Sequence, residues 1–124
     1  MLGRHLGIEI LEVGKGWAKT KMDIKPHHVN GVDVVHGGAI FALADVAFAA
    51  ASNSHGTIAV AINVNISFIK AARGPTLYAE AKEVACNHKL SNCSIRITDE
   101  NGDLIAIFEG LAYRKKHKLI DHDK

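Results

Sequence analysis

The stretch HGGAIFALADVAFAAASNS, residues 36–54, decides how this chain is organised. From residue 38 to residue 54 it consists mostly of Ala, Phe, Ile, Leu and Val, and Asp45 is its single charged residue. A continuous apolar run of this length predicts one long helix. Because the run is apolar nearly all round, we expect the helix to be buried on all sides rather than to lie on a surface.

The segments on either side of this helix predict strands. Residues 8–13 and 17–24 are typical of a hairpin, and residues 58–69 show the strongest period-two alternation in the chain. Further strands are expected at residues 77–86, 91–98 and 104–113, with a hairpin turn at residues 99–103 and a frayed, charged tail at residues 114–124. This outline predicts an α+β architecture in which an antiparallel sheet packs on one helix. Either the sheet curls around the helix, or a second copy of the chain covers the side that one sheet leaves open.

Length and composition limit the class of protein. At 124 residues, of which 48% are hydrophobic and 23% charged, the chain is expected to form one globular domain, residues 1–124. A net charge of +2 is too small to indicate nucleic-acid binding. No apolar run reaches the roughly 18 residues of a membrane span, and the N-terminal segment lacks the apolar core of a signal peptide. We therefore expect a cytoplasmic protein without a membrane partner.

The eight histidines and two cysteines do not show the spacing of a metal site, so we expect no metal. Cys86 and Cys93 flank a turn-like segment and are too few for a disulfide framework. In the expected cytosolic setting, both should be small, buried and reduced residues.

Asp45 and the start of the helix form the candidate site. Asp45 has apolar helical neighbours, and a buried carboxylate without a partner is costly, so we expect it at the edge of a cleft rather than in open solvent. His36, Gly37 and Gly38 stand where the loop becomes helix. The first turn offers N–H groups without an internal partner, and glycine allows close approach of an anion or of an oxygen that becomes anionic. Alternatively, the two glycines only allow the chain to turn tightly into the helix.

The spacing between these two features indicates a shared site. Asp45 follows Gly37 by eight residues, which corresponds to about 12 Å along a helix axis. An Asp side chain is too short to reach a carbonyl held at its own helix N-terminus. It could serve a carbonyl held by the antiparallel helix of a second subunit, and a two-fold dimer would then contain two equivalent sites.

These residues resemble the motif of the hotdog-fold acyl-CoA thioesterases, most closely the PaaI-type branch of phenylacetic acid degradation. The resemblance comprises Asn30, HGG at residues 36–38, LAD at residues 43–45 and Asn-Ser at residues 53–54. The strand order agrees from about residue 6 to residue 114. The resemblance implies a curved sheet wrapped around one long central helix, with subunits paired through a continuous sheet as a homodimer, commonly a dimer of dimers.

The resemblance also implies the reaction and the roles of individual residues. An acyl-CoA is hydrolysed to a free acid and CoA, so that CoA is part of the substrate and no separate cofactor is expected. Asp45 is implied as a general base or nucleophile, and Gly37 as the N–H donor to the thioester carbonyl. His36 and Asn30 are implied to orient the carbonyl or the water. The expected substrate-binding residues are Gly38 and Phe41, with Phe48 and Phe68 setting the depth of the acyl pocket and Lys70 and Arg73 near the CoA phosphates.

Other functions of the same fold remain open at this point. One is a non-catalytic acyl-CoA-binding module, and another is a hotdog-fold dehydratase, although the HGG and LAD motifs favour hydrolysis. Some relatives carry Ser or Thr on the strand after the helix, whereas this chain has Ala59, Val60 and Ala61 there. The residue that positions the water, the preferred acyl group and the arrangement of a tetramer therefore stay undetermined.

Overall fold

The computed structural model describes residues 7–29 and 34–118. The chain follows the order β1 (Ile8–Gly14), β2 (Trp17–Asp23), η1 (Pro26–His28), α2 (Gly37–Ser52), β3 (Thr57–Phe68), β4 (Thr76–Cys86), β5 (Leu90–Asp99) and β6 (Leu104–Lys118). This order of elements confirms the predicted α+β architecture, in which the strands lie close to the ranges expected from the sequence.

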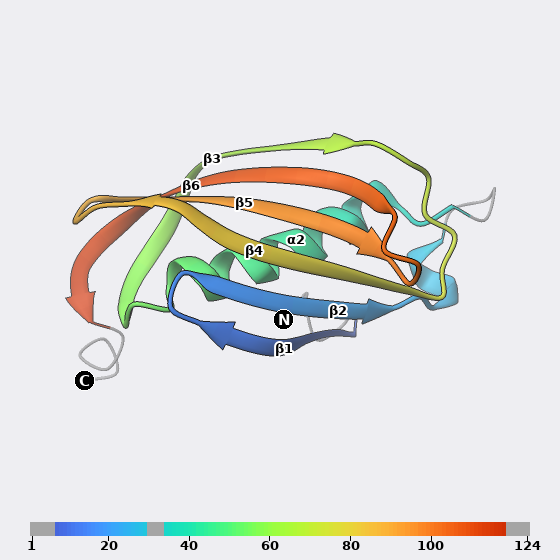
Figure 1. The fold of residues 1–124 in the computed structure, drawn as a ribbon, viewed down its shortest axis with the longest axis horizontal. Helices are drawn as coiled ribbons and strands as arrows, with labels where there is room; N and C mark the ends of the chain where they lie inside the picture. Colours follow the sequence, from blue (N-terminus) through green and yellow to red (C-terminus); the bar gives the residue numbers. More distant parts are fainter. Residues whose placement is uncertain (1–6, 30–33, 119–124) are drawn as a thin grey trace.

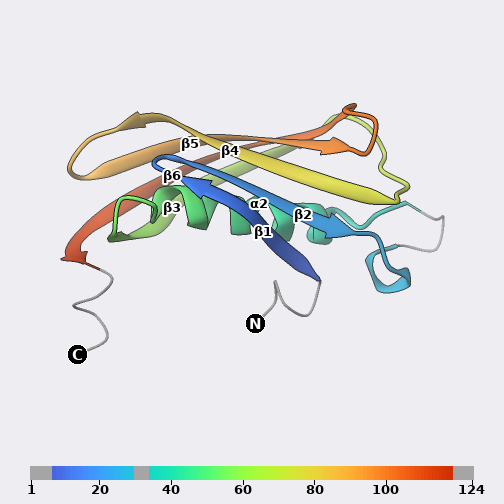
Figure 2. The same cartoon turned by 60° about the horizontal axis from the view of Figure 1, so that its bottom comes forward.

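Six strands of the described residues form one sheet in the order β1-β2-β4-β5-β6-β3, and each neighbouring pair is antiparallel. Figure 1 shows α2 lying along one face of this sheet, and Figure 2 shows the strands curving over the helix. The sheet therefore forms a curved layer around one helix, with β1 and β3 at its two edges.

The core lies between the helix and the inner face of the sheet. On β2, buried Ala18, Thr20 and Met22 alternate with partly exposed residues, as a strand with one covered face requires. From the far side of the core, the Phe108 ring contacts the rings of Phe41 and Phe48, with centroids 5.3 Å and 5.8 Å apart. Edge-on and tilted contacts of this kind pack helix against sheet.

The helix begins and ends slightly earlier than residues 38–54 because its ends are fixed by local hydrogen bonds. His36 is the N-cap residue and has extended backbone angles. At the other end, the Asn53 backbone N–H and side-chain Nδ2 both donate to the Ala49 carbonyl, at 3.0 Å and 2.7 Å. This arrangement ends α2 at Ser52 and starts the turn that leads into β3.

The expectation that the helix is buried on all sides is wrong for the single chain. Gly38, Asp45 and Ala49 are exposed and Phe41 is half-buried, so one apolar face of α2 is left uncovered by its own sheet. Asp45 lies on this face, exposed rather than at the edge of a buried cleft. The sheet curls around only one side of the helix and leaves the other side without a covering layer from the same sheet.

Two further expectations are corrected by the structure. Residues 114–118 are part of β6 rather than a frayed tail, because β3 offers its backbone as a pairing partner as far as Thr57 opposite Lys118. Residues 119–124 lie outside the described residues. Cys93 is buried and free as expected, whereas Cys86 is free but exposed, because it lies at the end of β4 where the strand leaves the core.

β3 carries large apolar side chains at the edge of the sheet. Val60, Ile62 and Phe68 are 43%, 56% and 54% exposed. An edge strand with such side chains is a template for pairing with another chain. Within the described residues, no helix is long and apolar enough to cross a membrane.

Candidate active site

The segment that leads into α2 is held on both sides by backbone hydrogen bonds. The Val35 N–H donates to the Ala72 carbonyl at 2.8 Å, and the His36 N–H donates to the His28 carbonyl at 2.7 Å. His28 is fully buried, and its Nδ1 accepts the Lys25 N–H at 2.8 Å. The start of the helix is thus fixed between η1 and the loop that follows β3.

The first turn of α2 leaves N–H groups available to a ligand. Ala39 and Ile40 already donate to the His36 carbonyl, at 3.1 Å and 3.2 Å. Gly37 and Gly38 come before them, where an N–H has no partner within the helix, and both residues are exposed. The helix dipole adds partial positive charge at this end, so the first turn suits an oxygen that gains negative charge.

A pocket of about 290 Å³ opens at this first turn. It is lined by residues 34–35, Gly37, Ile40 and residues 68–72, and the only charged side chain among them is Lys70. The Phe68 ring covers Gly37 so closely that a Cβ placed on Gly37 would lie 3.2 Å from Phe68 Cζ. An apolar pocket that ends on a backbone donor can hold an acyl chain with its carbonyl at the Gly37 N–H.

Asp45 carries the one charge on the uncovered face of the helix. Among the described residues, its carboxylate has no hydrogen bond or ion pair. Desolvation by its surroundings raises the pKa of Asp45 above its ordinary value. A carboxylate with no partner and a raised pKa has the properties of a general base or nucleophile.

The raised pKa predicts that Asp45 costs stability at neutral pH. Folded Asp45 holds its proton more tightly than unfolded Asp45, so its contribution to stability falls as pH rises from the unfolded pKa, about 3.9, through the folded pKa. Asp45→Asn should therefore raise the thermal unfolding midpoint at pH 7, and the difference should disappear near pH 3. Calorimetry across this pH range checks it, and an unchanged or lower midpoint at pH 7 would contradict it.

The other predicted site residues are placed in different surroundings. His36 is exposed and makes no side-chain capping bond, while Asn30 lies outside the described residues. Phe41, one helical turn after Gly37, packs against Phe108 and is not among the residues that line the pocket. Arg73 is exposed and also lies outside the pocket lining. The roles proposed for these residues stay predictions.

Lys70 is less available to a phosphate than the sequence suggested. Its Nζ is 2.7 Å from an Asp103 carboxylate oxygen and 4.0 Å from one of Asp99. The hydrogen bond that Lys70 Nζ donates to Asp103, together with the negative charge of that carboxylate, raises the pKa of Lys70. A phosphate would have to compete with these two carboxylates.

Sequence reasoning missed part of the pocket wall. Val34, Ile40 and Ile69 line the pocket, but nothing in their sequence pattern sets them apart from core residues. They come together because the Val35–Ala72 hydrogen bond joins two loops that are distant in the sequence. Only Phe68, Lys70 and the HGG motif could be found from the sequence.

Comparison with known proteins gives a consistent set of similarities. The sequence profile of the thioesterase superfamily matches residues 33–106. The chain is 36% identical to the acyl-coenzyme A thioesterase PaaI of Escherichia coli over 112 residues, covering 90% of this chain and 80% of that protein. It is 47% identical over 110 residues to an Archaeoglobus fulgidus protein whose name provisionally describes an esterase, covering 88% of this chain and 71% of that protein.

Solved structures with the same fold are similar to this chain. The E. coli PaaI protein from the phenylacetic acid degradation operon superimposes with a TM-score of 0.90 at 32% identity, covering 94% of this chain and 86% of that one. A variant of the phenylacetic acid degradation protein PaaI from Thermus thermophilus gives 0.87 at 30% identity, covering 92% and 98%.

Proposed function

We propose an active site for this chain from the premise that it belongs to the thioesterase superfamily and is a PaaI-type acyl-CoA thioester hydrolase of the hotdog fold. Asp45 of one subunit and the Gly37 N–H of another subunit form this site. The observation that carries this proposal is the apolar pocket that ends on the first turn of α2, at a backbone donor with no partner in the helix. Asp45 supplies the one unpaired carboxylate on the uncovered face of the same helix.

The reaction needs little beyond these two groups. The Gly37 N–H donates to the thioester carbonyl oxygen, and this bond strengthens as the oxygen becomes negative in the tetrahedral intermediate. Asp45 either removes a proton from the attacking water or attacks the carbonyl itself to form an acyl anhydride that water then hydrolyses. The CoA thiolate leaves, and His36 and Asn30 are assigned to orienting the carbonyl or the water.

Helix geometry supports a site shared between subunits. Eight residues separate Gly37 from Asp45, about 12 Å along the axis, so one chain cannot place both groups on the same carbonyl. A second copy packed antiparallel on the uncovered face of α2 would bring the two groups together. The exposed edge strand β3 supports the same partner, because pairing two β3 strands would extend the sheets of both subunits.

The proposed substrate is an aryl- or short- to medium-chain acyl-CoA. The pocket volume of about 290 Å³ and its apolar lining suit an acyl group of this size. Gly38, Phe41, Lys70 and Arg73 remain the proposed contacts to substrate, and a dimer of dimers remains the proposed assembly. A cytoplasmic location stays a prediction.

Gly37→Ala tests the role of the first turn. The added Cβ would meet Phe68 at 3.2 Å, whereas the Cβ of Gly38→Ala meets nothing within 4 Å. Because a small displacement of the carbonyl is costly, Gly37→Ala should lower kcat/KM for acyl-CoA hydrolysis by roughly 10–100-fold, and Gly38→Ala should lower it much less.

A panel of aryl- and fatty-acyl-CoA thioesters with a thiol-trapping dye measures these rates. The same panel separates the alternatives, since a binding module would bind the thioesters without turnover. Equal losses in the two glycine variants would contradict the assigned role of Gly37.

A further inference from the structure

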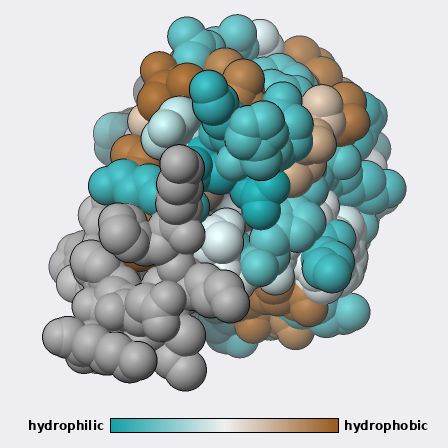
Figure 3. Space-filling view, turned by 90° about the vertical axis from the view of Figure 1, so that its left-hand side faces the viewer, coloured by the Kyte–Doolittle hydropathy of each residue, from teal (hydrophilic) through white to brown (hydrophobic). Residues whose placement is uncertain are grey.

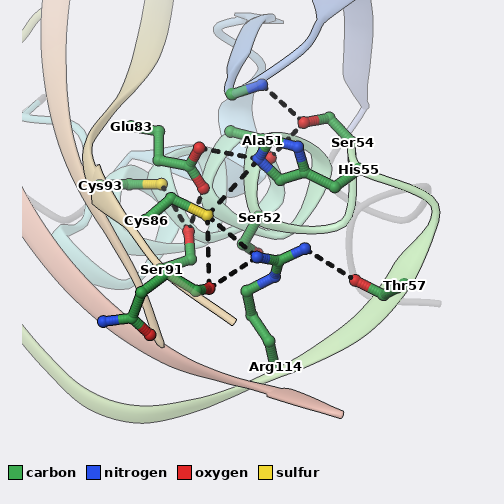
Figure 4. Close-up of polar contacts among 12 residues, drawn as sticks. Ala51, Ser52, Ser54, His55, Thr57, Glu83, Cys86, Ser91, Cys93 and Arg114 are labelled. Atoms are coloured by element: carbon green, nitrogen blue, oxygen red, sulfur yellow. Dashed lines mark hydrogen bonds and ion pairs between the residues drawn. The ribbon is translucent and has the colours of Figure 1, made fainter. Parts of the chain in front are cut away.

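Three side chains that can ligate a metal ion converge beyond the C-terminal end of α2, away from the pocket at its N-terminal end (Figure 4). His55 lies in the turn after α2, and Glu83 and Cys86 lie on β4. The His55 Nε2 atom is 2.8 Å from Glu83 Oε1 and 3.8 Å from Cys86 Sγ. All three ligand atoms lie within 4.8 Å of one another.

The geometry does not suit a catalytic triad. A triad needs the two ring nitrogens of histidine to bond to different partners, one to the nucleophile and one to the carboxylate. Here Glu83 and Cys86 both approach the same Nε2 atom. Burial and the charge of Glu83 also raise the pKa of the Cys86 thiol, which opposes a reactive thiolate.

Convergence of nitrogen, oxygen and sulfur on one point does suit Zn²⁺, which binds all three donor types. Tetrahedral bonds of about 2.0–2.3 Å place ligand atoms roughly 3.3–3.6 Å apart. The distances of 2.8 Å and 3.8 Å lie on either side of this range. Shifts of about 0.5 Å or less would therefore bring both contacts of His55 into this range, and the Glu83 and Cys86 donors lie within 4.8 Å of each other.

The surroundings support such a site. The Ser91 hydroxyl donates to Glu83 Oε2, which leaves Oε1 directed at His55. Arg114 Nη1 lies 3.2 Å from Cys86 Sγ and donates to the Asn87 carbonyl at 2.6 Å. Partners of this kind fix the orientation of metal ligands and stabilise a bound thiolate.

We propose that His55, Glu83 and Cys86 bind Zn²⁺, with water as the fourth ligand, and thereby join the turn after α2 to β4. On binding, His55 takes the neutral tautomer with its proton on Nδ1, so that the Nε2 lone pair binds the ion in place of the hydrogen bond to Glu83. The Cys86 thiol releases its proton to solvent as the zinc–sulfur bond forms, and no electron is transferred. The carboxylate and the thiolate then balance the charge of the ion. Figure 3 looks onto the end of the molecule that carries the β4–β5 turn, where hydrophilic residues are interspersed with hydrophobic patches.

The test uses the full chain without a histidine tag, stripped with a chelator and titrated with Zn²⁺ or Co²⁺. We expect one ion per chain, a thermal midpoint that rises by several degrees with Zn²⁺, and a thiolate-to-cobalt charge-transfer band with Co²⁺. Cys86→Ser should abolish the band, and Ser91→Ala should weaken zinc affinity by roughly 10–100-fold.

Two matched controls keep the result interpretable. Cys93→Ala removes the other thiol, and His88→Gln removes an exposed histidine from the β4–β5 turn, so both should retain stoichiometric binding and the band. Circular dichroism checks that each variant is folded, and X-ray absorption on the wild type should find one sulfur at about 2.3 Å from zinc. Substoichiometric binding by the wild type, or a band that survives Cys86→Ser, would overturn the proposal.

Discussion

Asp45→Asn should lower kcat for acyl-CoA hydrolysis by roughly 10²–10⁴-fold, the contribution expected of a general base. The substitution keeps the shape of the side chain but removes its charge and its ability to accept a proton. Because Asp45 is exposed on α2 of the single chain, the loss should occur without loss of fold. Steady-state kinetics on the best thioester of the panel measure the effect, and substrate binding should persist.

Two further measurements define the role of this carboxylate. Glu12→Gln removes a charge from an exposed position on β1 and should leave kcat unchanged. A single turnover in water labelled with heavy oxygen distinguishes the two mechanisms. A general base places the label in the acid product in every turnover. Unlabelled oxygen in the acid of the first turnover identifies a nucleophile whose anhydride is hydrolysed at the Asp45 carbonyl. A kcat for Asp45→Asn within a few-fold of the wild type would contradict the assigned chemistry.

Ile62→Lys should separate the subunits that pair through β3 and leave little activity. Ile62 is 56% exposed on the edge strand β3, and a lysine on each of two paired strands would place like charges in the proposed interface. Without a partner, Asp45 and Gly37 cannot meet, so activity should fall about as far as in Asp45→Asn. Light scattering coupled to size-exclusion chromatography reports the mass, and the thioester assay reports the activity.

Val84→Lys is the matched control for this experiment. Val84 is 67% exposed on β4, at a position outside the proposed interface. Val84→Lys therefore replaces an exposed apolar side chain with the same charged side chain as Ile62→Lys does. It should keep the oligomeric mass and the activity of the wild type. A fully active monomer of Ile62→Lys would refute the shared site.

The period of the sequence predicted most of the fold, for physical reasons that the structure makes clear. The alternation of residue types along β2 corresponds to alternating burial in the structure, because one face of that strand packs on α2. The same kind of alternation over β3 produced exposed side chains instead, because β3 lies at the sheet edge and the register shifts between Ala61 and Asn63. Periodicity identifies a strand but does not say whether another layer covers it.

The candidate site could be found only in part. HGG and LAD pointed to Gly37 and Asp45, because glycines at a helix start allow close approach of a ligand and a charge in an apolar helix is costly. His55, Glu83 and Cys86 gave no such signal. His55, in the turn after α2, and Glu83, on β4, are 28 residues apart in the sequence. Only tertiary packing brings them together. Cys86 appeared buried in the sequence pattern because the end of a strand cannot be distinguished from its middle by residue type.

The carboxylate of Asp45 is unpaired and has a raised pKa, so it destabilises the fold while supplying the proposed chemistry. A neutral helix former would suit the apolar surface of α2 better. A charge at this position is useful only if the carboxylate faces a substrate, and the helix geometry allows this only through a partner subunit.

A mixed dimer of Asp45→Asn and Gly37→Pro chains tests the shared site most directly. The backbone at the first helical position accepts proline, which removes the N–H, and His36 before it, with ψ of 137°, is compatible with a following proline. The proline ring meets the Phe68 side chain, as the Cβ of Gly37→Ala does. Each variant alone should be inactive. The mixed dimer, purified through two different tags, should contain one intact site and recover about half of the wild-type kcat per dimer. A mixed dimer as inactive as its parents would show that Asp45 and Gly37 act within one chain.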